Sequence, residues 1–415
     1  MSLSCTAKRE WRKLPVPLSE LHINTVLRCG QSFRWRKNGN EWSCALSARI
    51  LTLQQTPTHL LYHAIPFSPP GHPTTEDLLR DYFQLNISLS DLYKKWAAAD
   101  PHFQRISSSF GGIRMLRQDP WENLVSFICS SNNNISRISG MVQGLCTEWG
   151  APLGSVDIPS PVDPEDGMPL EEKTVAYYDF PPPEKLCGDE VEGRLRKLGF
   201  GYRAGYIVET ARMVNDKGLD WLVGLRERPY QEVKEELVKL KGVGPKVADC
   251  VALMSLDKKG AVPVDTHVLQ IAQRDYGFGK TKNKTLTTKT YDAIGEHFRN
   301  LWGEEAGWAH SVLFTADLKS FSEQLVKTKT ETTSVSVKKE RVVVKNETGT
   351  GTGVEKETPG EVKEQTRTTK RVRVKVEVKK EVNEEVNDEV KEQMWDDDVN
   401  GVPSSLAERV KRRRR

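Results

Sequence analysis

The sequence predicts an α+β fold, in which an N-terminal antiparallel β-sheet precedes a long helical region and a disordered C-terminal tail. Residues 18–65 contain short, aromatic-rich runs of the kind that form strands. From about residue 75 the apolar residues recur at helical spacing instead. The chain has 415 residues, which is enough for two or three domains, each with its own core.

The strand signal is strongest in QSFRWRKNGNEWSCAL, residues 31–46. Two aromatic-rich runs flank Asn38-Gly39, and this dipeptide between such runs predicts a β-hairpin. The next segment, RILTLQQT, alternates in character and predicts a further strand. We therefore assign residues 1–110 to an antiparallel-sheet domain with flanking helices.

Helical patterns fill most of residues 111–320, and we assign this region to a second, helical domain. Thr75, and either Ser88 or Ser90, are the predicted N-caps of the first helices after the sheet. Residues 151–183 are rich in Pro, Asp and Glu, which predicts a surface insertion. The strongest helical segments are PWENLVSFICSSNNNISRISGMVQGLCTEWG, GDEVEGRLRKLGFGYRAGYIVETARMV, EVKEELVKL and GWAHSVLFTADLKSF.

Residues 321–415 have the composition of a disordered, mixed-charge tail, with many Lys, Glu, Thr and Val and few aromatic residues. The tail ends in five consecutive cations, Lys411 to Arg415, which predict a nuclear-import signal. Nuclear localisation is therefore expected. The short basic N-terminus leaves the mitochondrion open as a second compartment.

The rest of the composition excludes several classes of protein. The seven cysteines are scattered, odd in number and without a CxxC pair, which favours reduced thiols and argues against zinc ribbons and clustered iron–sulfur ligation. No stretch approaches the roughly 18 to 20 apolar residues of a membrane span, so no membrane partner is expected. The formal net charge of +4 is too small to predict nucleic-acid binding by itself.

The segment LKGVGPKVADC, residues 240–250, has an unusual lysine. Gly242 and Gly244 predict a tight turn, and Pro245 suits the first position of the following helix. We therefore expect residues 237–254, approximately, to form two helices joined by a glycine hairpin. Such a hairpin exposes backbone N–H groups to an anion such as a DNA phosphate. An ordinary turn between two packed helices is the alternative. Lys246 falls in the first helical turn, where the helix dipole disfavours a cation.

A second unusual charge is Asp265, in the apolar stretch AVPVDTHV. A carboxylate there needs a partner, and Lys246 is the leading candidate. Asp265 is alternatively the cap of a helix that begins at Thr266 or His267. A partly desolvated lysine at a helix N-terminus favours its neutral amine, and a neutral amine is the nucleophile that forms Schiff bases. The pair therefore predicts nucleophilic catalysis.

These residues carry a family resemblance. LKGVGPKVADC followed by PVDTH resembles the helix–hairpin–helix DNA glycosylases with a catalytic lysine and a downstream aspartate. The motifs GQSFRWR, LRQDPWENLVSFICSSNNNISRI, LGFGYRAGY and SLDKKGAVPVDTHVLQIAQRDY resemble the eukaryotic 8-oxoguanine DNA glycosylase/AP lyases, over nearly all of residues 10–320. The insertion and the tail lie outside this resemblance.

The resemblance implies two helical lobes with the active site between them. It also implies a bifunctional, monomeric base-excision repair enzyme that removes 8-oxoguanine, and formamidopyrimidine, opposite cytosine in duplex DNA. Lys246 would attack the sugar C1′ and form a Schiff base that permits β-elimination, while Asp265 would activate the lysine and stabilise positive charge on the sugar. No organic cofactor or metal centre is implied, although the hairpin carbonyls could bind a monovalent cation.

In the damaged-base pocket, the resemblance assigns the Gly30 carbonyl to the N7–H of 8-oxoguanine. Cys250 and Phe314 would contact the two faces of the base, and Pro263 would line the same pocket. One position departs from the family, because His310 stands where a glutamine is usual. Neutral histidine offers one donor and one acceptor on opposite sides of its ring, so we expect activity with an altered tolerance among purine lesions.

The remaining roles concern the duplex. By resemblance, Asn132 would fill the gap left by the everted base and would read the orphaned cytosine with Arg137 and Arg203. Tyr202 would act as a wedge in the base stack. His267 would contact a phosphate, oriented by Asp317, and Gly242 and Gly244 would approach the DNA backbone.

Two other interpretations remain open. A related glycosylase for oxidised pyrimidines would commonly carry four C-terminal cysteines, whereas this chain has none after Cys250. A non-catalytic helix–hairpin–helix protein that only grips duplex DNA would explain the glycines but would leave Lys246 and Asp265 without a role.

Overall fold

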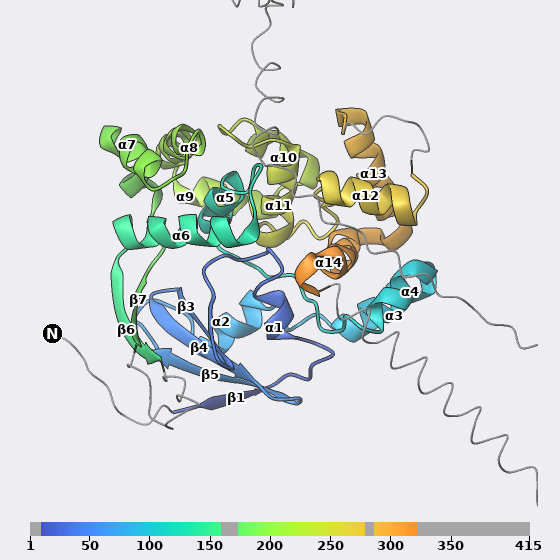
Figure 1. The fold of residues 1–415 in the computed structure, drawn as a ribbon, viewed down its shortest axis with the longest axis horizontal. Coiled ribbons are helices and arrows are strands. Elements are labelled where there is room, and N and C mark those ends of the chain that lie inside the picture. The colour runs from blue at the N-terminus through green and yellow to red at the C-terminus, as the bar shows by residue number, and fades with distance from the viewer. Residues whose placement is uncertain (1–9, 159–172, 279–285, 322–415) are drawn as a thin grey trace, which may run out of the picture. The chain divides into compact units, whose positions relative to one another are not determined.

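The predicted N-terminal sheet is present and has five antiparallel strands (Figure 1). The computed structural model describes residues 10–158, 173–278 and 286–321, and all of these belong to one unit. The strands lie in the order β1-β5-β4-β3-β2. Their bounds are β1 Arg12–Pro15, β2 Arg36–Asn38, β3 Glu41–Leu46, β4 Arg49–Gln55 and β5 His59–Ile65.

The β2–β3 and β3–β4 hairpins are both tight, and the turn of the first lies one residue later than the sequence indicates. Asn38 pairs with Glu41, so the two turn residues are Gly39 and Asn40, one position later than the predicted Asn38-Gly39. Gly39 has φ +54°, and a first turn position with positive φ favours glycine. The hairpin between β3 and β4 turns at Ser47 and Ala48, both with positive φ and neither with a turn signature. At this hairpin the pairing register of β3 and β4 is set by the burial of both strands, because the turn residues themselves have no preference for the turn.

The predicted insertion is not only a surface loop. Its flanks form a two-stranded antiparallel sheet, β6 Pro152–Ile158 and β7 Lys173–Tyr178. Val156 and Tyr177 are buried against Ala45 and Ile50, so this hairpin covers part of the five-stranded sheet. That contact explains why β3 is buried on both faces and lacks a clean alternation. Residues 159–172 lie outside the described part of the chain.

Helices make up the rest of the described chain, as predicted. The helix at residue 75 is capped by Thr74, one residue before the predicted Thr75, because the Thr74 hydroxyl accepts the Asp77 N–H. Ser88 caps the next helix. The helices before the second sheet are α1 Ile23–Val26, α2 Thr75–Tyr82, α3 Leu89–Ala99, α4 Pro101–Ser107, α5 Pro120–Ile128 and α6 Ile135–Trp149. Those after it are η1 Pro183–Leu186, α7 Asp189–Lys197, α8 Arg203–Lys217, α9 Leu219–Gly224, η2 Leu225–Glu227, α10 Tyr230–Val238, α11 Pro245–Ser255, α12 Thr266–Asp275, α13 Thr288–Trp302, η3 Gly303–Glu305 and α14 Ala306–Asp317.

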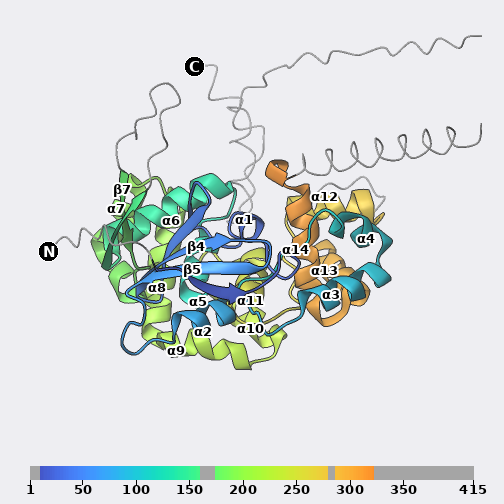
Figure 2. The ribbon, with the colours of Figure 1, turned by 90° about the horizontal axis from the view of Figure 1, so that it is seen from below.

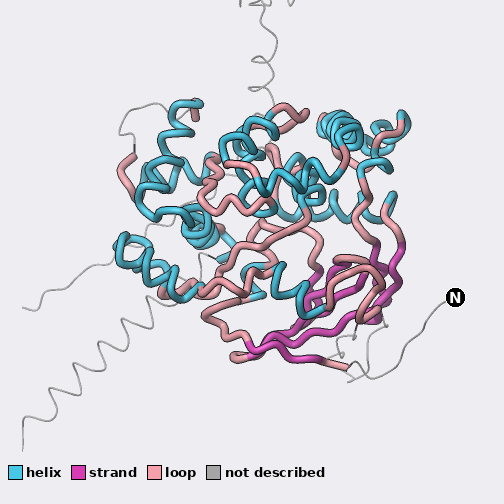
Figure 3. Tube along the Cα trace, turned by 180° about the vertical axis from the view of Figure 1, so that it is seen from behind, coloured by secondary structure: helices cyan, strands magenta, loops and turns pink. Residues whose placement is uncertain are grey.

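The helices form two groups. Helices α5 to α11 lie on one side, and α3, α4, α12, α13 and α14 lie on the other (Figure 2). Figure 3 shows the sheet at one end of the molecule and the helices over the remainder. Helices α3 and α4, which we assigned to the sheet domain, pack in the helical core. Trp96 and Phe103 lie edge to face at 5.5 Å, and Phe103 also contacts Trp302.

None of the helices in the described part of the chain is long and apolar enough to cross a membrane. The tail beyond Phe321, with the cations Lys411 to Arg415, falls outside the described residues.

Candidate active site

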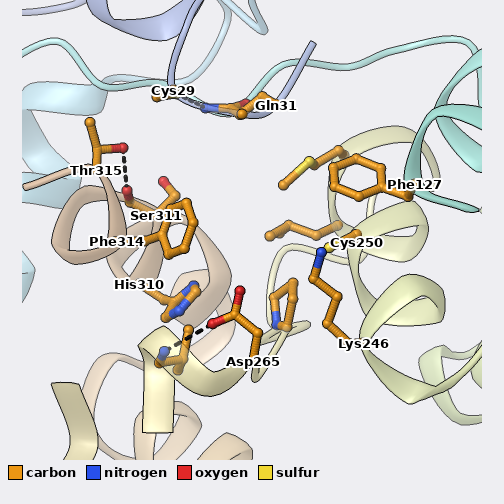
Figure 4. Close-up of a pocket in the computed structure, with 15 residues that line it drawn as sticks. Cys29, Gln31, Phe127, Lys246, Cys250, Asp265, His310, Ser311, Phe314 and Thr315 are labelled. Atoms are coloured by element: carbon orange, nitrogen blue, oxygen red, sulfur yellow. Dashed lines mark hydrogen bonds between the residues drawn. The ribbon is translucent and has the colours of Figure 1, made fainter. Parts of the chain in front are cut away.

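One pocket gathers the predicted catalytic pair and every predicted base-contact residue (Figure 4). Its walls come from the segment before β2, from α5 and α11, and from α12 and α14 with the loop before α12. The two helical groups thus contribute opposite walls. The lining residues are Cys29, Gly30, Gln31, Phe127, Lys246, Cys250, Leu253, Met254, Pro263, Asp265, Val268, His310, Ser311, Phe314 and Thr315.

Lys246 lies in the first turn of α11, immediately after Pro245. From Val247 to Ser255 the helix is buried throughout, whereas Lys246, at its N-terminal end, is only partly buried and lines the pocket together with Cys250, Leu253 and Met254 of the same helix. Its Nζ donates to the Ser130 hydroxyl at 3.2 Å and lies 5.0 Å from the centroid of the Phe127 ring. The amine is therefore held in place by two neighbours while it faces the cavity (Figure 4).

Asp265 faces the same cavity from the other helical group (Figure 4). It is the N-cap of α12, and its carboxylate accepts the Val268 N–H at 3.0 Å. The predicted cap of a helix beginning at Thr266 is confirmed, whereas in the described part of the chain Lys246 bonds to Ser130 and not to Asp265. The cap supplies the partner that the carboxylate requires and directs it across the pocket from the amine.

His310 is nearly fully buried in α14. Its ring lies 6.2 Å from that of Phe298 and 6.3 Å from that of Phe314. Burial lowers the pKa of His310 to about 4, and the nearby Asp265 carboxylate opposes this shift only in part. The imidazole is therefore neutral near pH 7. Its Nε2 has no hydrogen-bond partner among the described residues. A buried polar atom without a partner, beside a pocket, is suited to bonding an incoming ligand.

The His310 environment predicts a change of stability with pH. Below pH 6.5 an unfolded chain takes up a proton at this imidazole, whereas the folded chain stays neutral until pH falls to about 4. Stability is therefore lost as pH falls through this window. We expect the thermal midpoint of the wild type to fall more between pH 7 and pH 5 than that of a His310→Gln variant. Equal falls in the two proteins would contradict a neutral, buried imidazole.

The segment Cys29-Gly30-Gln31 forms the wall opposite His310 (Figure 4). Gly30 has φ +88°, a conformation that favours glycine. The Gln31 side chain donates to the Arg114 carbonyl at 3.1 Å and accepts the Leu116 N–H at 2.9 Å, while the Gln31 carbonyl accepts from Gln118. These buried bonds fix the wall against the irregular segment 113–119, which precedes α5.

Cys250 lies one turn after Lys246 in the same wall. Burial raises the pKa of its thiol to about 11, although Lys246 opposes the shift. The thiol is therefore protonated near neutral pH and presents a polarizable packing surface, not a nucleophile.

Several pocket residues were absent from the sequence prediction, notably Phe127, Met254, Ser311 and Thr315. Their apolar or small side chains at helical spacing look like ordinary core positions. Ser130 was also missed as the partner of Lys246, although its place beside the polar run Ser131–Asn134 was the available signal.

The glycine hairpin between α10 and α11 has the predicted form. Gly242 has φ +76°, and a Cβ there would lie 2.6 Å from the Tyr206 ring. Gly244 is the N-cap of α11 with extended backbone, and a Cβ there would meet open space. The fold therefore requires glycine at position 242, where a side chain would clash. At position 244 the fold has room for a side chain, and glycine instead leaves the N–H groups of the helix N-terminus accessible.

This difference gives a matched pair of variants. Gly242→Ala is expected to lower the free energy of unfolding by about 1–3 kcal/mol, because it combines an unfavourable φ with a clash. Gly244→Ala meets no clash and should cost less stability, about 0.5–1 kcal/mol for an alanine at an N-cap, but it should weaken binding to duplex DNA, because a methyl group would obstruct a phosphate at the helix N-terminus. Thermal melts and a binding titration on each variant measure both effects. An unchanged affinity of Gly244→Ala for duplex DNA would contradict a phosphate contact at this helix N-terminus.

Of the predicted gap-filling group, Asn132, Arg137 and Tyr202 are exposed, and Tyr202 and Arg203 bond to the loop that carries Asn132. Asn132 is exposed and has φ +45°, which is uncommon for a residue other than glycine. Arg203 donates to the Ser131 and Asn132 carbonyls, and Tyr202 donates to the Ser131 carbonyl at 3.3 Å. Arg203 is buried, so here it supports the loop that presents Asn132. Arg137 is exposed, and its guanidinium lies 3.4 Å from the Gly199 carbonyl, to which it donates.

His267, the predicted phosphate contact, is exposed at the start of α12. Its Nδ1 lies 3.7 Å from an Asp317 carboxylate oxygen, which fits the predicted orienting role. Asp317 also accepts from Arg274 at 2.8 Å, so it is shared between His267 and Arg274. No group of three or more His, Cys, Asp or Glu side chains in the described ranges is arranged to hold a metal.

Known proteins resemble this chain in sequence and fold. Residues 13–124 match the family model for the N-terminal domain of 8-oxoguanine DNA glycosylase, and residues 125–296 match that for the HhH-GPD superfamily of base excision DNA repair proteins. The N-glycosylase/DNA lyase of Saccharomyces cerevisiae is 39% identical over 341 residues, which covers 74% of this chain and 86% of the yeast protein. The N-glycosylase/DNA lyase OGG1 of Arabidopsis thaliana is 36% identical over 333 residues, or 78% and 86% of the two chains.

A solved structure agrees with these matches. The 8-oxoguanine glycosylase/lyase of Clostridium acetobutylicum, in complex with duplex DNA containing cytosine opposite 8-oxoguanine, superposes with a TM-score of 0.58 and 27% identity. The superposition covers 74% of this chain and 97% of the bacterial one.

The helix–hairpin–helix beside a lysine- and aspartate-lined pocket defines the class as base-excision DNA repair proteins of the HhH-GPD superfamily. Within that superfamily, the chain belongs to the 8-oxoguanine DNA glycosylase family of N-glycosylase/DNA lyases. It is accordingly an enzyme with DNA N-glycosylase and DNA lyase activities.

Proposed function

We propose that the enzyme excises 8-oxoguanine, and formamidopyrimidine, paired with cytosine in duplex DNA, through a Schiff base on Lys246. The observation that carries the proposal is that the Lys246 amine and the Asp265 carboxylate both line one pocket, between mostly apolar walls. The solved relative with cytosine opposite 8-oxoguanine supports the choice of lesion and opposite base. An enzyme that acts on a base within a duplex must first evert that base into such a pocket.

In this mechanism the Nζ lone pair of Lys246 forms a bond to C1′ of the everted nucleotide. The N-glycosidic bond breaks, and its electron pair leaves with the base, which takes up a proton. Asp265 stabilises the positive charge that develops on the sugar as this bond breaks. The C1′–O4′ bond then breaks, O4′ takes up a proton that Nζ gives up, and an imine forms between Nζ and C1′. Loss of a proton from C2′ expels the 3′ phosphate by β-elimination.

The pocket walls would hold the base during this reaction. Cys250 and Phe314 would pack on its two faces, with Pro263 beside them, and the Gly30 carbonyl would accept the N7–H that 8-oxoguanine has and guanine lacks. Across the duplex, Asn132 would enter the vacated space and Tyr202 would wedge the stack. Arg137 and Arg203 would donate to the orphaned cytosine after Arg203 exchanges its present bonds to the loop carbonyls.

The proposal is tested by base release from duplexes that differ only in the lesion or in the opposite base. We expect release of 8-oxoguanine opposite cytosine to be faster than opposite adenine. A duplex with thymine glycol should be a poor substrate. Preference for thymine glycol would favour the oxidised-pyrimidine alternative. Tight duplex binding without any base release would favour a protein that only grips DNA.

A substitution of His310 tests whether this residue affects the preference of the enzyme among lesions. A glutamine amide offers a donor and an acceptor side by side, whereas the neutral imidazole offers them on opposite sides of the ring. We therefore expect His310→Gln to change the ratio of steady-state efficiencies for 8-oxoguanine and formamidopyrimidine by about 10-fold, the scale of one altered hydrogen bond. An unchanged ratio would show that residue 310 does not read the base.

Further parts of the proposal concern the surroundings of the enzyme. The hairpin carbonyls of Leu240 and Lys241 each accept one hydrogen bond, which leaves each a lone pair for a monovalent cation near a phosphate. We place the enzyme in the nucleus because of the five cations Lys411 to Arg415, with the mitochondrion as a second compartment, and by its family we expect it to act as a monomer. Loss of nuclear import on deletion of Lys411 to Arg415 would support this placement.

A further inference from the structure

Asp249 is a buried carboxylate on the catalytic helix that the mechanism above does not use. It follows Lys246 by three residues in α11, is 1% exposed and does not line the pocket. Burial raises the pKa of Asp249, and the nearby Lys234 opposes the shift. Three groups from neighbouring helices satisfy it. Tyr230 donates at 2.6 Å, Tyr291 donates to the second oxygen, and Lys234 lies 3.4 Å away.

Tyr291 differs from Tyr230 in having a second bond. The Tyr291 hydroxyl, which donates to Asp249, also accepts the backbone N–H of Val264 at 3.4 Å. Val264 is fully buried and lies between Pro263 and Asp265, and both of these neighbours line the pocket. One hydroxyl on α13 therefore connects the helix of the nucleophile to the loop that carries the catalytic carboxylate.

We propose that Tyr291 is a positioning residue, whose hydroxyl fixes the position of the loop that carries Pro263 and Asp265 relative to the helix that carries Lys246. This inference rests on the proposed function, because it concerns the spacing between the amine and the carboxylate in that reaction. The two groups come from opposite helical groups and have no hydrogen bond to each other within the described residues. Their separation is therefore set by the elements that carry them, and Tyr291 joins those elements.

Tyr230 supplies a matched control within the same cluster. Its hydroxyl donates to the same carboxylate from α10, but in the described structure it makes no hydrogen bond to the loop of residues 261–265. Tyr230→Phe and Tyr291→Phe each remove one hydroxyl and one bond to Asp249, while the aromatic ring remains. Each should lower the thermal midpoint, Tyr291→Phe by more than Tyr230→Phe, because it also leaves the buried Val264 N–H without its acceptor. Only Tyr291→Phe releases the loop.

The experiment measures three quantities on both variants and on the wild type. These are the single-turnover rate of 8-oxoguanine release at saturating enzyme, the dissociation constant for the duplex, and the thermal midpoint. For Tyr291→Phe we expect the release rate to fall by about 10- to 100-fold, the scale of a small misplacement of catalytic groups. The dissociation constant should change by less than about twofold, since no DNA contact is lost. Tyr230→Phe should keep a release rate within about twofold of the wild type.

Each other outcome contradicts the inference. Equal losses of rate in the two variants would assign the effect to Asp249 and the packing of α11. An unchanged rate in Tyr291→Phe would show that Tyr291 does not position the loop. A fall in duplex affinity without a fall in the saturated rate would place Tyr291 in binding. If the wild type releases no 8-oxoguanine, the proposed function fails, and this inference fails with it. If the wild type is active, only the inference is under test.

Discussion

Replacement of Lys246 by glutamine is expected to lower base release by about 10³-fold or more, the scale of losing a covalent nucleophile. The amide has no nucleophilic lone pair at pH 7, so neither the bond to C1′ nor the imine can form. Glutamine is nevertheless close in length to lysine and can still donate to the Ser130 hydroxyl. The fold and the pocket should therefore persist.

Single-turnover release at saturating enzyme measures this effect apart from binding. The same change at Lys217, an exposed residue of α8 that pairs with Glu236 at 3.4 Å, is the matched control and should leave the rate unchanged. The duplex dissociation constant of Lys246→Gln should stay close to that of the wild type. A variant that keeps more than about a tenth of the rate would assign the chemistry to another group.

Asp265 is expected to show two separable effects, because its carboxylate both caps α12 and faces the pocket. Asparagine caps a helix about as well as aspartate but carries no charge. Asp265→Asn should therefore keep the thermal midpoint and lower the release rate by about 10²- to 10³-fold, the scale of removing one electrostatic stabiliser.

Asp265→Ala completes this comparison. It removes the charge and also leaves the Val268 N–H without its acceptor, so it should add a loss of about 1 kcal/mol in stability to the loss of rate. If Asp265→Asn loses stability but keeps its rate, the carboxylate acts as a helix cap alone.

Much of the site could be predicted from short motifs. The glycine turn, Pro245 and Lys246 specify a helix start by local backbone chemistry, and the structure places Lys246 there. Asp265 was recognised as an unusual charge in an apolar stretch, and its capping bond is likewise local, to a residue three positions on. Such features depend on neighbours in sequence, so the sequence alone carries them.

The errors have a different physical origin. The expected Lys246–Asp265 pair needed the relative placement of two helical groups, which tertiary packing decides. The positive-φ turn at Ser47 and Ala48 depends on strand pairing, and the burial of the β6–β7 hairpin depends on contact with Ala45 and Ile50. None of these long-range contacts leaves a local pattern.

Asp249 shows the same limit within one motif. In LKGVGPKVADC it reads as a polar residue on an amphipathic helix, although it is almost fully buried. Its partners Tyr230 and Tyr291 come from 19 residues before and 42 residues after it. Only the packing of α10, α11 and α13 brings them together, so sequence spacing could not have assigned Tyr291 a place in the site.

The central claim is that Lys246 forms a covalent imine with the sugar of a damaged nucleotide. The most direct test incubates the wild-type protein with a duplex that contains 8-oxoguanine opposite cytosine, in the presence of borohydride to reduce the imine. Peptide mapping then locates the adduct. We expect one covalent adduct, carried by the peptide that contains Lys246 and absent from Lys246→Gln. Base release without any adduct, or an adduct on another residue, would contradict the assignment of Lys246 as the nucleophile.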